Sequence, residues 1–410
     1  MQILFVHQNF PAQFGHVAEY LATKHGCECL FATKRVVPRP PKRIRILNYP
    51  NPRTAPKGMH PANLSNENAI WHAWVVKEMV EQHPEVRPDL IVGHSGFGST
   101  LFLSELFHGT PLLNYFEYFY RARDSDIDFR PDFPPHPEAR YRSRARNATL
   151  LLDLHGCTRG QCPTRFQHST LPPEYQDKVE VIFDGIDPQL WKPCAPADRK
   201  IGDWVVPKGV RLVTYATRGM ESMRGFDVFV SVAHRLSKER PDVVFAIAGQ
   251  DRIAYGSDTR HTGGKSLKQY LFETVNPDRS RFKFLGLLPP AELAKLLSLS
   301  DLHFYLTVPF VLSWSLFNAL SCGATVLASD TDPVREVMTH ERTGLLVNFF
   351  DEDGFLALAR RVLAEPAAFR PLGQASRELV VRNYSYDVCL PQIAQLYART
   401  SGVPLPTPHV

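Results

Sequence analysis

The sequence predicts an α/β protein made of two halves, each built around a parallel sheet with helices on both faces. Short apolar segments typical of buried strands alternate with amphipathic segments of helical period. This alternation stops over a stretch rich in proline and arginine and starts again near Val210. A chain of 410 residues is also too long for one ordinary core, because cores rarely grow beyond about 250–300 residues.

Composition excludes several classes of protein. A hydrophobic content of 44% and a charged content of 22% are ordinary for a soluble globular protein. The net charge of +5 is too small to argue for a nucleic-acid partner. Seven cysteines without a Cys-x-x-Cys motif disfavour a disulfide framework and a zinc site. The apolar start lacks a signal-peptide pattern and no stretch is long enough to span a bilayer, so we expect a cytoplasmic protein.

The first half alternates strands and helices before a long loop. Strands are predicted at 3–6, 29–32, 44–47, 89–92 and 111–115, and helices at 13–23, at 66–82 with Ser65 as the N-cap, and in a segment ending at Phe107. The proline-rich stretch 121–146 is expected to be a loop that leads into a basic helix at 138–146. Loops of this length are often functional.

The second half repeats the pattern. Strands are predicted at 212–216, 243–248, 282–285, 302–306, 325–328 and 344–347, and helices at 226–238, 315–323, 352–364 and 386–400, with an inserted loop at 251–266. The expected division is an N-terminal domain at 1–195, a C-terminal domain at 196–385, a helix at 386–402 that packs back on the first domain, and a tail at 403–410. Ligands of such folds bind at the carboxyl ends of the strands and between domains.

A strand, a loop and a short helix follow one another between Ser300 and Gly323. The helix begins near Ser313–Ser315, where free backbone N–H groups and the positive end of the helix dipole can hold an anion such as a diphosphate. By itself this pattern is also explained by a solvated serine that caps a structural helix. Its neighbours in the sequence decide between these interpretations.

Several motifs occur together in the second half. They are Asp184-Gly185-Ile186-Asp187, Trp191-Lys192-Pro193, Thr217-Arg218 with Arg224-Gly225, Phe284-Leu285-Gly286, Gly323 before a strand that ends in Ala328-Ser329, and Thr343-Gly344-Leu345-Leu346-Val347. In this order they resemble the family 4 glycosyltransferases, also called group 1, over Asp184 to about Val347 and more weakly in the first half. The resemblance implies the GT-B fold, in which two Rossmann-like domains face an interdomain cleft.

The resemblance also implies roles for particular residues. An Arg and a Lys at the positions of Arg218 and Arg224 bind the donor diphosphate in the family and stabilise the leaving group. Fixed cations lower the barrier where negative charge develops, and Arg at 224 keeps that charge. The alternative is two solvated arginines on a loop. The other donor-binding residues that we expect are Gln13, Phe14, Gly15, Gly225, Leu285, Phe310, Ser313, Trp314, Ser315, Leu316 and Asn318.

The chain departs from the family pattern at three places. Phe310 and Asn318 occupy the positions of two acidic residues that contact the donor sugar and the ribose. Asn318 can still hydrogen-bond a ribose, whereas the side chain of Phe310 cannot bond a sugar. Backbone N–H groups near Ser313 could hold the sugar, the sugar could be oriented differently, or activity could be lost. The turn after the first strand, at 9–15, has only one late glycine, Gly15.

Candidate acceptor residues lie in the first half. Glu117 stands where the family often has a histidine, and a carboxylate there could orient or deprotonate an acceptor hydroxyl. The alternative is an ion pair between Glu117 and Arg121. His94 is a second candidate, or a structural histidine. The basic run Arg140, Arg142, Arg144 and Arg146 suits either a solvated face or contact with an anionic acceptor or membrane surface.

The sequence therefore predicts a retaining glycosyltransferase that moves a hexose from a nucleotide-diphosphate sugar to an acceptor hydroxyl, in bacterial glycan or glycoconjugate synthesis. Retention and independence of a metal follow from the resemblance alone. We expect no cofactor beyond the nucleotide-sugar co-substrate and no nucleic-acid partner. The acceptor would be a glycan, a lipid-linked compound or a small molecule, with peripheral membrane contact as one option, and the chain a monomer or homodimer. The alternatives are a nucleotide-sugar epimerase and a non-catalytic nucleotide-sugar-binding protein.

Overall fold

The computed structural model describes residues 1–194 and 197–406, which form two compact units. Unit 1 contains Met1–Ile127, His136–Asp184 and the described residues from Asp387 onward. Unit 2 contains Asp128–Pro135 and Gly185–Tyr386. The expected domain boundary at 195/196 and the end of the expected tail, 407–410, lie outside the described residues.

The sheet of unit 1 is parallel throughout. Its strands, in spatial order, are β3 (Ile44–Asn48), β2 (Glu28–Thr33), β1 (Gln2–Val6), β4 (Leu90–His94), β5 (Leu112–Tyr115), β6 (Arg159–Cys162) and β7 (Val179–Val181). The apolar residues of the four central strands, β2, β1, β4 and β5, are buried, as the continuous hydrophobic runs predict. The order reverses between β1 and β4, so unit 1 has a topological switch point at the carboxyl ends of these strands.

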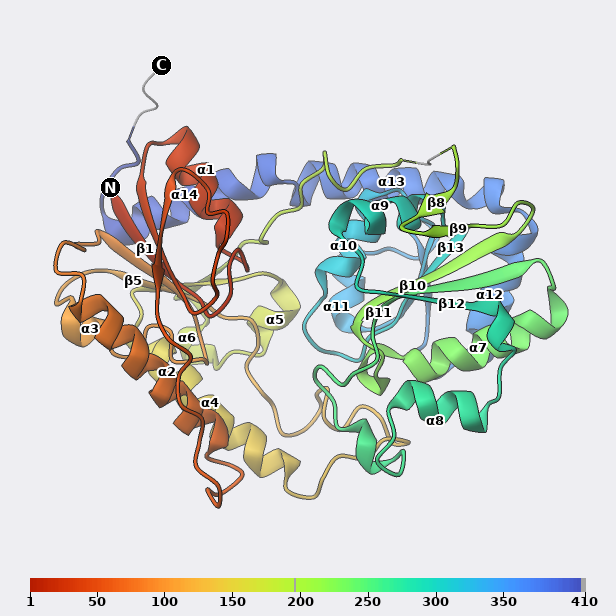
Figure 1. The fold of residues 1–410 in the computed structure, drawn as a ribbon, viewed down its shortest axis with the longest axis horizontal. Coiled ribbons are helices and arrows are strands. Elements are labelled where there is room, and N and C mark those ends of the chain that lie inside the picture. Colours follow the sequence, from red (N-terminus) through yellow and green to blue (C-terminus); the bar gives the residue numbers. More distant parts are fainter. Residues whose placement is uncertain (195–196, 407–410) are drawn as a thin grey trace. The chain divides into compact units, whose positions relative to one another are not determined.

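Helices cover both faces of this sheet. In Figure 1, α1 (Gly15–Lys24) and α14 (Tyr386–Ser401) lie on one face, and α2 (Leu64–Glu81) and α4 (Ala139–Gly156) lie on the other. Shorter helices, α3 (Leu103–Leu106), α5 (Arg165–Ser169) and α6 (Pro173–Gln176), connect the strands. The ring of Tyr397 in α14 lies 6.2 Å from that of Phe5 in β1, which ties the C-terminal helix into this core.

Unit 2 has a second parallel sheet. Its spatial order is β12 (Phe282–Gly286), β11 (Val243–Gln250), β10 (Arg211–Gly219), β13 (Leu302–Tyr305), β14 (Val326–Ser329) and β15 (Leu345–Val347). A separate antiparallel pair, β8 (Lys200–Ile201) and β9 (Trp204–Val205), precedes it. The order reverses between β10 and β13, which puts the switch point of this sheet beside the segments that carry the expected donor site.

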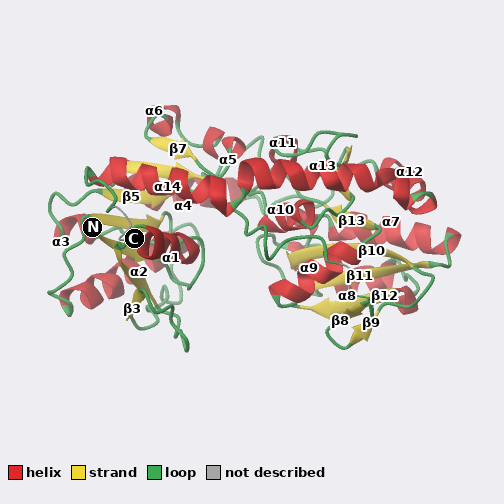
Figure 2. Ribbon diagram, turned by 90° about the horizontal axis from the view of Figure 1, so that it is seen from above, coloured by secondary structure: helices red, strands yellow, loops and turns green. Residues whose placement is uncertain are grey.

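The helices of unit 2 also form two layers around their sheet, as Figures 1 and 2 show. On one face lie α7 (Phe226–Glu239) and α8 (Leu267–Thr274), and on the other α9 (Pro290–Leu299) and α10 (Trp314–Ser321). The remaining elements are α11 (Asp332–Arg335), α12 (Glu352–Ala364), α13 (Pro366–Tyr384) and the short 3-10 helices η1 (Ser222–Arg224), η2 (Asp258–Arg260) and η3 (Arg279–Arg281). Within the described residues, none of the helices has the length and hydropathy to cross a membrane.

The predicted α/β alternation is confirmed, and its errors have local causes. The chain enters α2 through Asn63, so the prediction that Ser65 caps this helix was wrong. The basic helix α4 continues to Gly156, ten residues beyond the expected end at Arg146. Strand β6 was missed because its sequence, Arg-Gly-Gln-Cys, has no apolar run. Helix α13 was missed because it contains Pro371 and carries many polar side chains.

Buried histidines are a feature of both cores. His303 in β13 is fully buried, and its Nδ1 lies 2.8 Å from the hydroxyl of Thr214 in β10. Burial lowers the pKa of His303 to about 3. In unit 1, burial lowers the pKa of His16 and of His72 to about 4. These side chains are neutral in the folded protein at neutral pH, because burial disfavours the charged form of an imidazole.

Acidification should therefore destabilise the protein. A histidine whose folded pKa is depressed contributes stability that is present above pH 6.5 and is lost as the pH falls toward the folded pKa. Each such group lowers the free energy of unfolding by up to about 1.4 kcal/mol per pH unit. The variant His303→Leu should be measured by urea unfolding between pH 7.5 and pH 5. Its free energy of unfolding should fall less steeply with decreasing pH than that of wild type. The exposed control His108→Leu should keep the wild-type slope, and an unchanged slope in His303→Leu would contradict this account.

Candidate functional site

The carboxyl end of β10 leads into the first part of the site. Arg218 is the second-last residue of the strand and is exposed, and η1 then brings Arg224 to the start of α7. Gly225, between η1 and α7, has a φ of +60°. A Cβ atom at this position would lie 2.6 Å from the Cβ of Leu306, the residue that follows β13. Glycine is needed here for the left-handed backbone and for the close approach of two segments.

Arg224 is a buried cation, with only 6% of its surface exposed. Its Nη1 donates to the hydroxyl of Thr307 at 2.7 Å, and both Nη atoms donate to the carbonyl oxygen of Val311 at 3.2 Å. The guanidinium carbon lies 5.2 Å from the ring centre of Tyr255 and 5.9 Å from that of Phe310. Within the described residues Arg224 forms no ion pair with a carboxylate. Its direct contacts are therefore hydrogen-bond acceptors and aromatic faces, and a carboxylate, Glu221, acts on its charge only from a longer distance.

The loop that carries Tyr255 is anchored by a carboxylate that the sequence analysis did not single out. Glu221 is fully buried, and its Oε2 accepts hydrogen bonds from the consecutive backbone amides of Ala254, Tyr255 and Gly256 at 3.1, 2.9 and 2.9 Å. Burial raises the pKa of Glu221, while these amides and Arg224 oppose that rise. Glu221 lies between the two predicted arginines, and no local pattern distinguishes it from a solvated residue.

The start of α10 forms the opposite side of the site. Ser313 is the N-cap, and its hydroxyl accepts from the amide of Ser315 at 3.2 Å. The amide of Ser313 itself donates to the hydroxyl of Tyr305 at 3.0 Å. One small pocket of unit 2 is lined by Arg218, Arg224, Ser313 and Ser315, together with Tyr255. The structure thus brings together four of the residues that the sequence singled out.

The other candidates in unit 2 do not line this pocket. Phe310 is 5% exposed and makes an edge contact with the ring of Tyr255 at 5.5 Å. Leu316 is fully buried in α10, whereas Trp314 is exposed. The side-chain oxygen of Asn318 is buried and has no hydrogen-bond partner among the described residues. Leu285 is half-buried at the end of β12.

The turn after β1 in unit 1 carries three further candidates. Phe14 belongs to the core, with its ring 6.1 Å from that of Tyr115 and 5.9 Å from that of His7. The amide of Gly15 donates to the carbonyl oxygen of Pro11 at 2.7 Å, which starts α1. Gln13 is half-buried in the turn itself. Side-chain packing therefore accounts for Phe14, and the start of α1 accounts for Gly15.

His94 and Glu117 lie together at the carboxyl edge of the sheet of unit 1. His94 Nε2 is 4.0 Å from Glu117 Oε2. Arg121, which we considered as a partner of Glu117, donates instead to the carbonyl oxygen of Ser169. His7, at the end of β1, contacts the ring of His94 at 5.5 Å and was not predicted. Burial, reinforced by His94, lowers the pKa of His7 to about 3.

Groups that could hold a metal ion are scattered in the described part of the chain. No cluster of three or more histidine, cysteine, aspartate or glutamate side chains with suitable placement occurs there. The pocket of unit 2 instead offers guanidinium groups, hydroxyl groups, a helix N-terminus and an aromatic face. These groups suit an anionic ligand that also carries a ring.

Comparison with known proteins assigns the family. Residues 25–190 match the Glycosyl transferase family 4 group, and residues 198–379 match the Glycosyl transferases group 1. The chain belongs to the family 4, or group 1, glycosyltransferases, and it has their GT-B fold. The resemblance noted from the motifs is thus confirmed, and it extends over both halves.

Two solved structures and one curated protein illustrate the relationship. Sucrose-phosphate synthase from Thermosynechococcus elongatus has a TM-score of 0.75 and 18% identity, covering 97% of this chain and 98% of its own. Anabaena HepE in complex with UDP and glucose has a TM-score of 0.68 and 15% identity, covering 97% of this chain and 100% of its own. Alpha-maltose-1-phosphate synthase from Mycolicibacterium smegmatis is 25% identical over 57% of this chain, and the match spans only 60% of that relative.

The close approach at Gly225 gives a test of how the site is built. Gly225→Ala combines an unfavourable positive φ, worth about 1–2 kcal/mol, with a clash against Leu306 worth about 1–3 kcal/mol more. Gly202→Ala is the matched control, because Gly202 has a φ of +54° but open space around its Cβ. Chemical denaturation should show the larger loss of stability for Gly225→Ala. Equal losses would mean that the contact with Leu306 is not a constraint.

Proposed function

We propose that this chain transfers a hexose from a nucleoside diphosphate sugar to an acceptor hydroxyl, with retention of configuration. The observation that carries the proposal is the pocket of unit 2. There Arg218 and Arg224 line the same space as Ser313 and Ser315 at the N-terminus of α10. Two guanidinium groups and a helix N-terminus form a strong site for a diphosphate.

The same groups suit the chemical step. During transfer, the bond between the anomeric carbon and the donor phosphate oxygen breaks, and a bond to the acceptor oxygen forms. Negative charge then develops on the departing nucleoside diphosphate. Arg218 and Arg224 line the pocket in which that charge would develop, so they can stabilise the transition state. Arg224 in particular is held in place by Thr307 and Val311.

Unit 1 supplies the residues proposed for the acceptor. Glu117 is 39% exposed at its side chain and lies 4.0 Å from the buried His94. A carboxylate in this position can orient an acceptor hydroxyl or take up its proton. The wider setting that we infer is cytoplasmic, with a glycan, a lipid-linked compound or a small molecule as the acceptor.

The sugar side of the donor site must differ from the family pattern. Phe310 offers an aromatic face where the pattern has a carboxylate, so we propose that backbone N–H groups around Ser313 hold the sugar. The side-chain oxygen of Asn318, which has no hydrogen-bond partner in the described part of the chain, is suited to accept a hydrogen bond from a ribose hydroxyl. Retention and metal independence rest on the family pattern. UDP and glucose, which HepE binds in its solved complex, are natural first members of a ligand panel.

A second candidate is a non-catalytic protein that binds nucleotide sugars. Phe310 supports it, because the carboxylate that contacts the sugar in the family is missing. The engagement of Arg224 with Val311 and Thr307 supports it as well, since part of the guanidinium is already used. Binding without turnover would distinguish this candidate from an active transferase.

Removal of Arg218 should reduce catalysis without harming the fold, because this side chain is exposed. We expect Arg218→Ala to lower kcat/KM by about two orders of magnitude or more, which is the usual effect of losing one preorganised charge-stabilising group. The measurement is the release of nucleoside diphosphate from a panel of UDP-, GDP-, ADP- and dTDP-linked sugars.

The control for this experiment is Arg370→Ala, which removes an exposed arginine of α13 in the same unit. It should retain wild-type activity. If the wild type neither binds nor turns over any member of the panel, the proposed function is wrong. If Arg218→Ala is as active as Arg370→Ala, Arg218 has no role in the reaction.

A further inference from the structure

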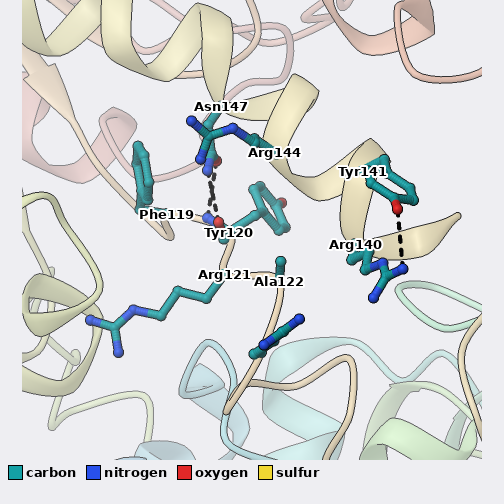
Figure 3. A pocket seen from close by; sticks show the side chains of 9 residues that line it. Phe119, Tyr120, Arg121, Ala122, Arg140, Tyr141, Arg144 and Asn147 are labelled. Carbon is teal, nitrogen blue, oxygen red and sulfur yellow. Dashed lines mark hydrogen bonds between the residues drawn. The ribbon is translucent and has the colours of Figure 1, made fainter.

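A hollow in unit 1 lies between the chain that follows β5 and helix α4. We call it the arginine hollow, after the four arginines that line it, Arg121, Arg123, Arg140 and Arg144. Figure 3 shows Arg140, Tyr141 and Arg144 extending from α4 on one side and the segment from Phe119 to Ala122 on the other. It is a surface cavity large enough for a small-molecule ligand.

Carboxylates of the described residues do not neutralise the charge of the arginine hollow. None of its four arginines forms an ion pair with a carboxylate among the described residues, and none of the residues that line it is acidic. The guanidinium of Arg121 donates to a backbone carbonyl, and that of Arg140 donates to the hydroxyl of Tyr141 at 3.1 Å. Several uncompensated cations around one concavity raise the local concentration of anions.

The wall of the hollow is ordered by contacts within the protein. The side chain of Asn147 is buried and accepts from the amide of Tyr120 at 3.1 Å, while it donates to the carbonyl oxygen of Tyr120 at 2.7 Å. The guanidinium carbon of Arg146 lies 4.0 Å from the ring centre of Tyr120. Tyr120 is thus fixed without a ligand, and less side-chain entropy is lost when one binds.

The hollow also continues the segment that carries the proposed acceptor group. Phe119 follows Glu117 by two residues, and Glu117 itself follows the carboxyl end of β5. The backbone oxygen of Glu117 and the amide of Phe119 are hydrogen-bonded by the side chains of Gln167 in α5 and of Thr170, which follows α5. The position of Glu117 and the lining of the hollow are therefore set by one continuous, well-anchored piece of chain.

We propose that the arginine hollow binds a phosphate group carried by the acceptor, and that the aromatic faces of Tyr120 and Tyr141 take the adjoining ring. Phosphate fits better than a carboxylate, because it carries more charge and offers three oxygens to several planar guanidinium groups. The identification of the ligand as an acceptor rests on the proposed function. The phosphate site itself can be tested without turnover.

The test is calorimetric titration of the full chain with inorganic phosphate, glucose 1-phosphate and glucose. Wild type should bind glucose 1-phosphate, bind inorganic phosphate more weakly, and bind glucose least. The double variant Arg140→Gln/Arg144→Gln should weaken glucose 1-phosphate binding by at least about tenfold, the effect expected for losing charge-assisted hydrogen bonds. Arg218→Ala should bind it as wild type does, which separates this site from the pocket of unit 2.

The matched control is Arg43→Gln/Arg87→Gln, which removes the same charge from two exposed arginines that precede β3 and β4. It should bind glucose 1-phosphate like wild type, and an equal loss in both double variants would overturn the proposal. Failure of wild type to bind any phosphate compound, either in solution or in phosphatidylcholine vesicles doped with a polyprenyl phosphate, would also overturn it. Binding to the doped vesicles alone would support a lipid-linked acceptor, and binding in solution a soluble one.

These outcomes are independent of the proposed function. If glucose 1-phosphate binding depends on Arg140 and Arg144 but no nucleotide sugar is turned over, the phosphate site is supported and the transferase proposal fails. If nucleotide sugars are turned over while the Arg140→Gln/Arg144→Gln variant keeps the wild-type affinity for glucose 1-phosphate, the transferase proposal is supported and the phosphate site is rejected.

Discussion

The site of unit 2 depends on one buried guanidinium group. Arg224 is nearly inaccessible, yet among the described residues no carboxylate forms an ion pair with it. A cation in such a place costs free energy unless hydrogen bonds, aromatic faces or a ligand compensate for its lost hydration. Thr307 and Val311 bind part of it, and Tyr255 faces it. We interpret the remaining charge as the part that an anionic ligand neutralises.

The residues around Arg224 hold its guanidinium group in place. Gly225 lets the chain turn directly against Leu306. Arg224 therefore lies at the edge of the sheet, and α7 begins at the residue after Gly225. Glu221 collects three backbone amides and thereby fixes the loop that presents Tyr255. Burial of this carboxylate is expensive, and it is offset by the three amides together with the nearby charge of Arg224. The architecture is thus preorganised for charge, as catalysis of a charge-developing step requires.

The sequence predicted the architecture well and the site in part, and the difference has physical causes. Apolar runs and helical periodicity predicted the α/β alternation, because burial in a parallel sheet demands them. Ordered motifs predicted that Arg218, Arg224 and the start of α10 line one pocket, since carboxyl ends of parallel strands meet at one edge. Glu221 and Tyr255 could not be predicted. Their importance comes from contacts between segments about 33 to 35 residues apart, and neither has a distinctive local pattern.

Binding of nucleoside diphosphates, followed by the melting temperature, tests the central role of Arg224 most directly. A ligand that binds only the folded state raises the melting temperature according to its concentration and affinity. The account predicts that at least one of UDP, GDP, ADP and dTDP raises the melting temperature of the wild-type protein. It also predicts that Arg224→Lys, which keeps the charge, retains much of this increment, whereas Arg224→Met loses it. An equal increment in Arg224→Met, or none in wild type, would contradict the account.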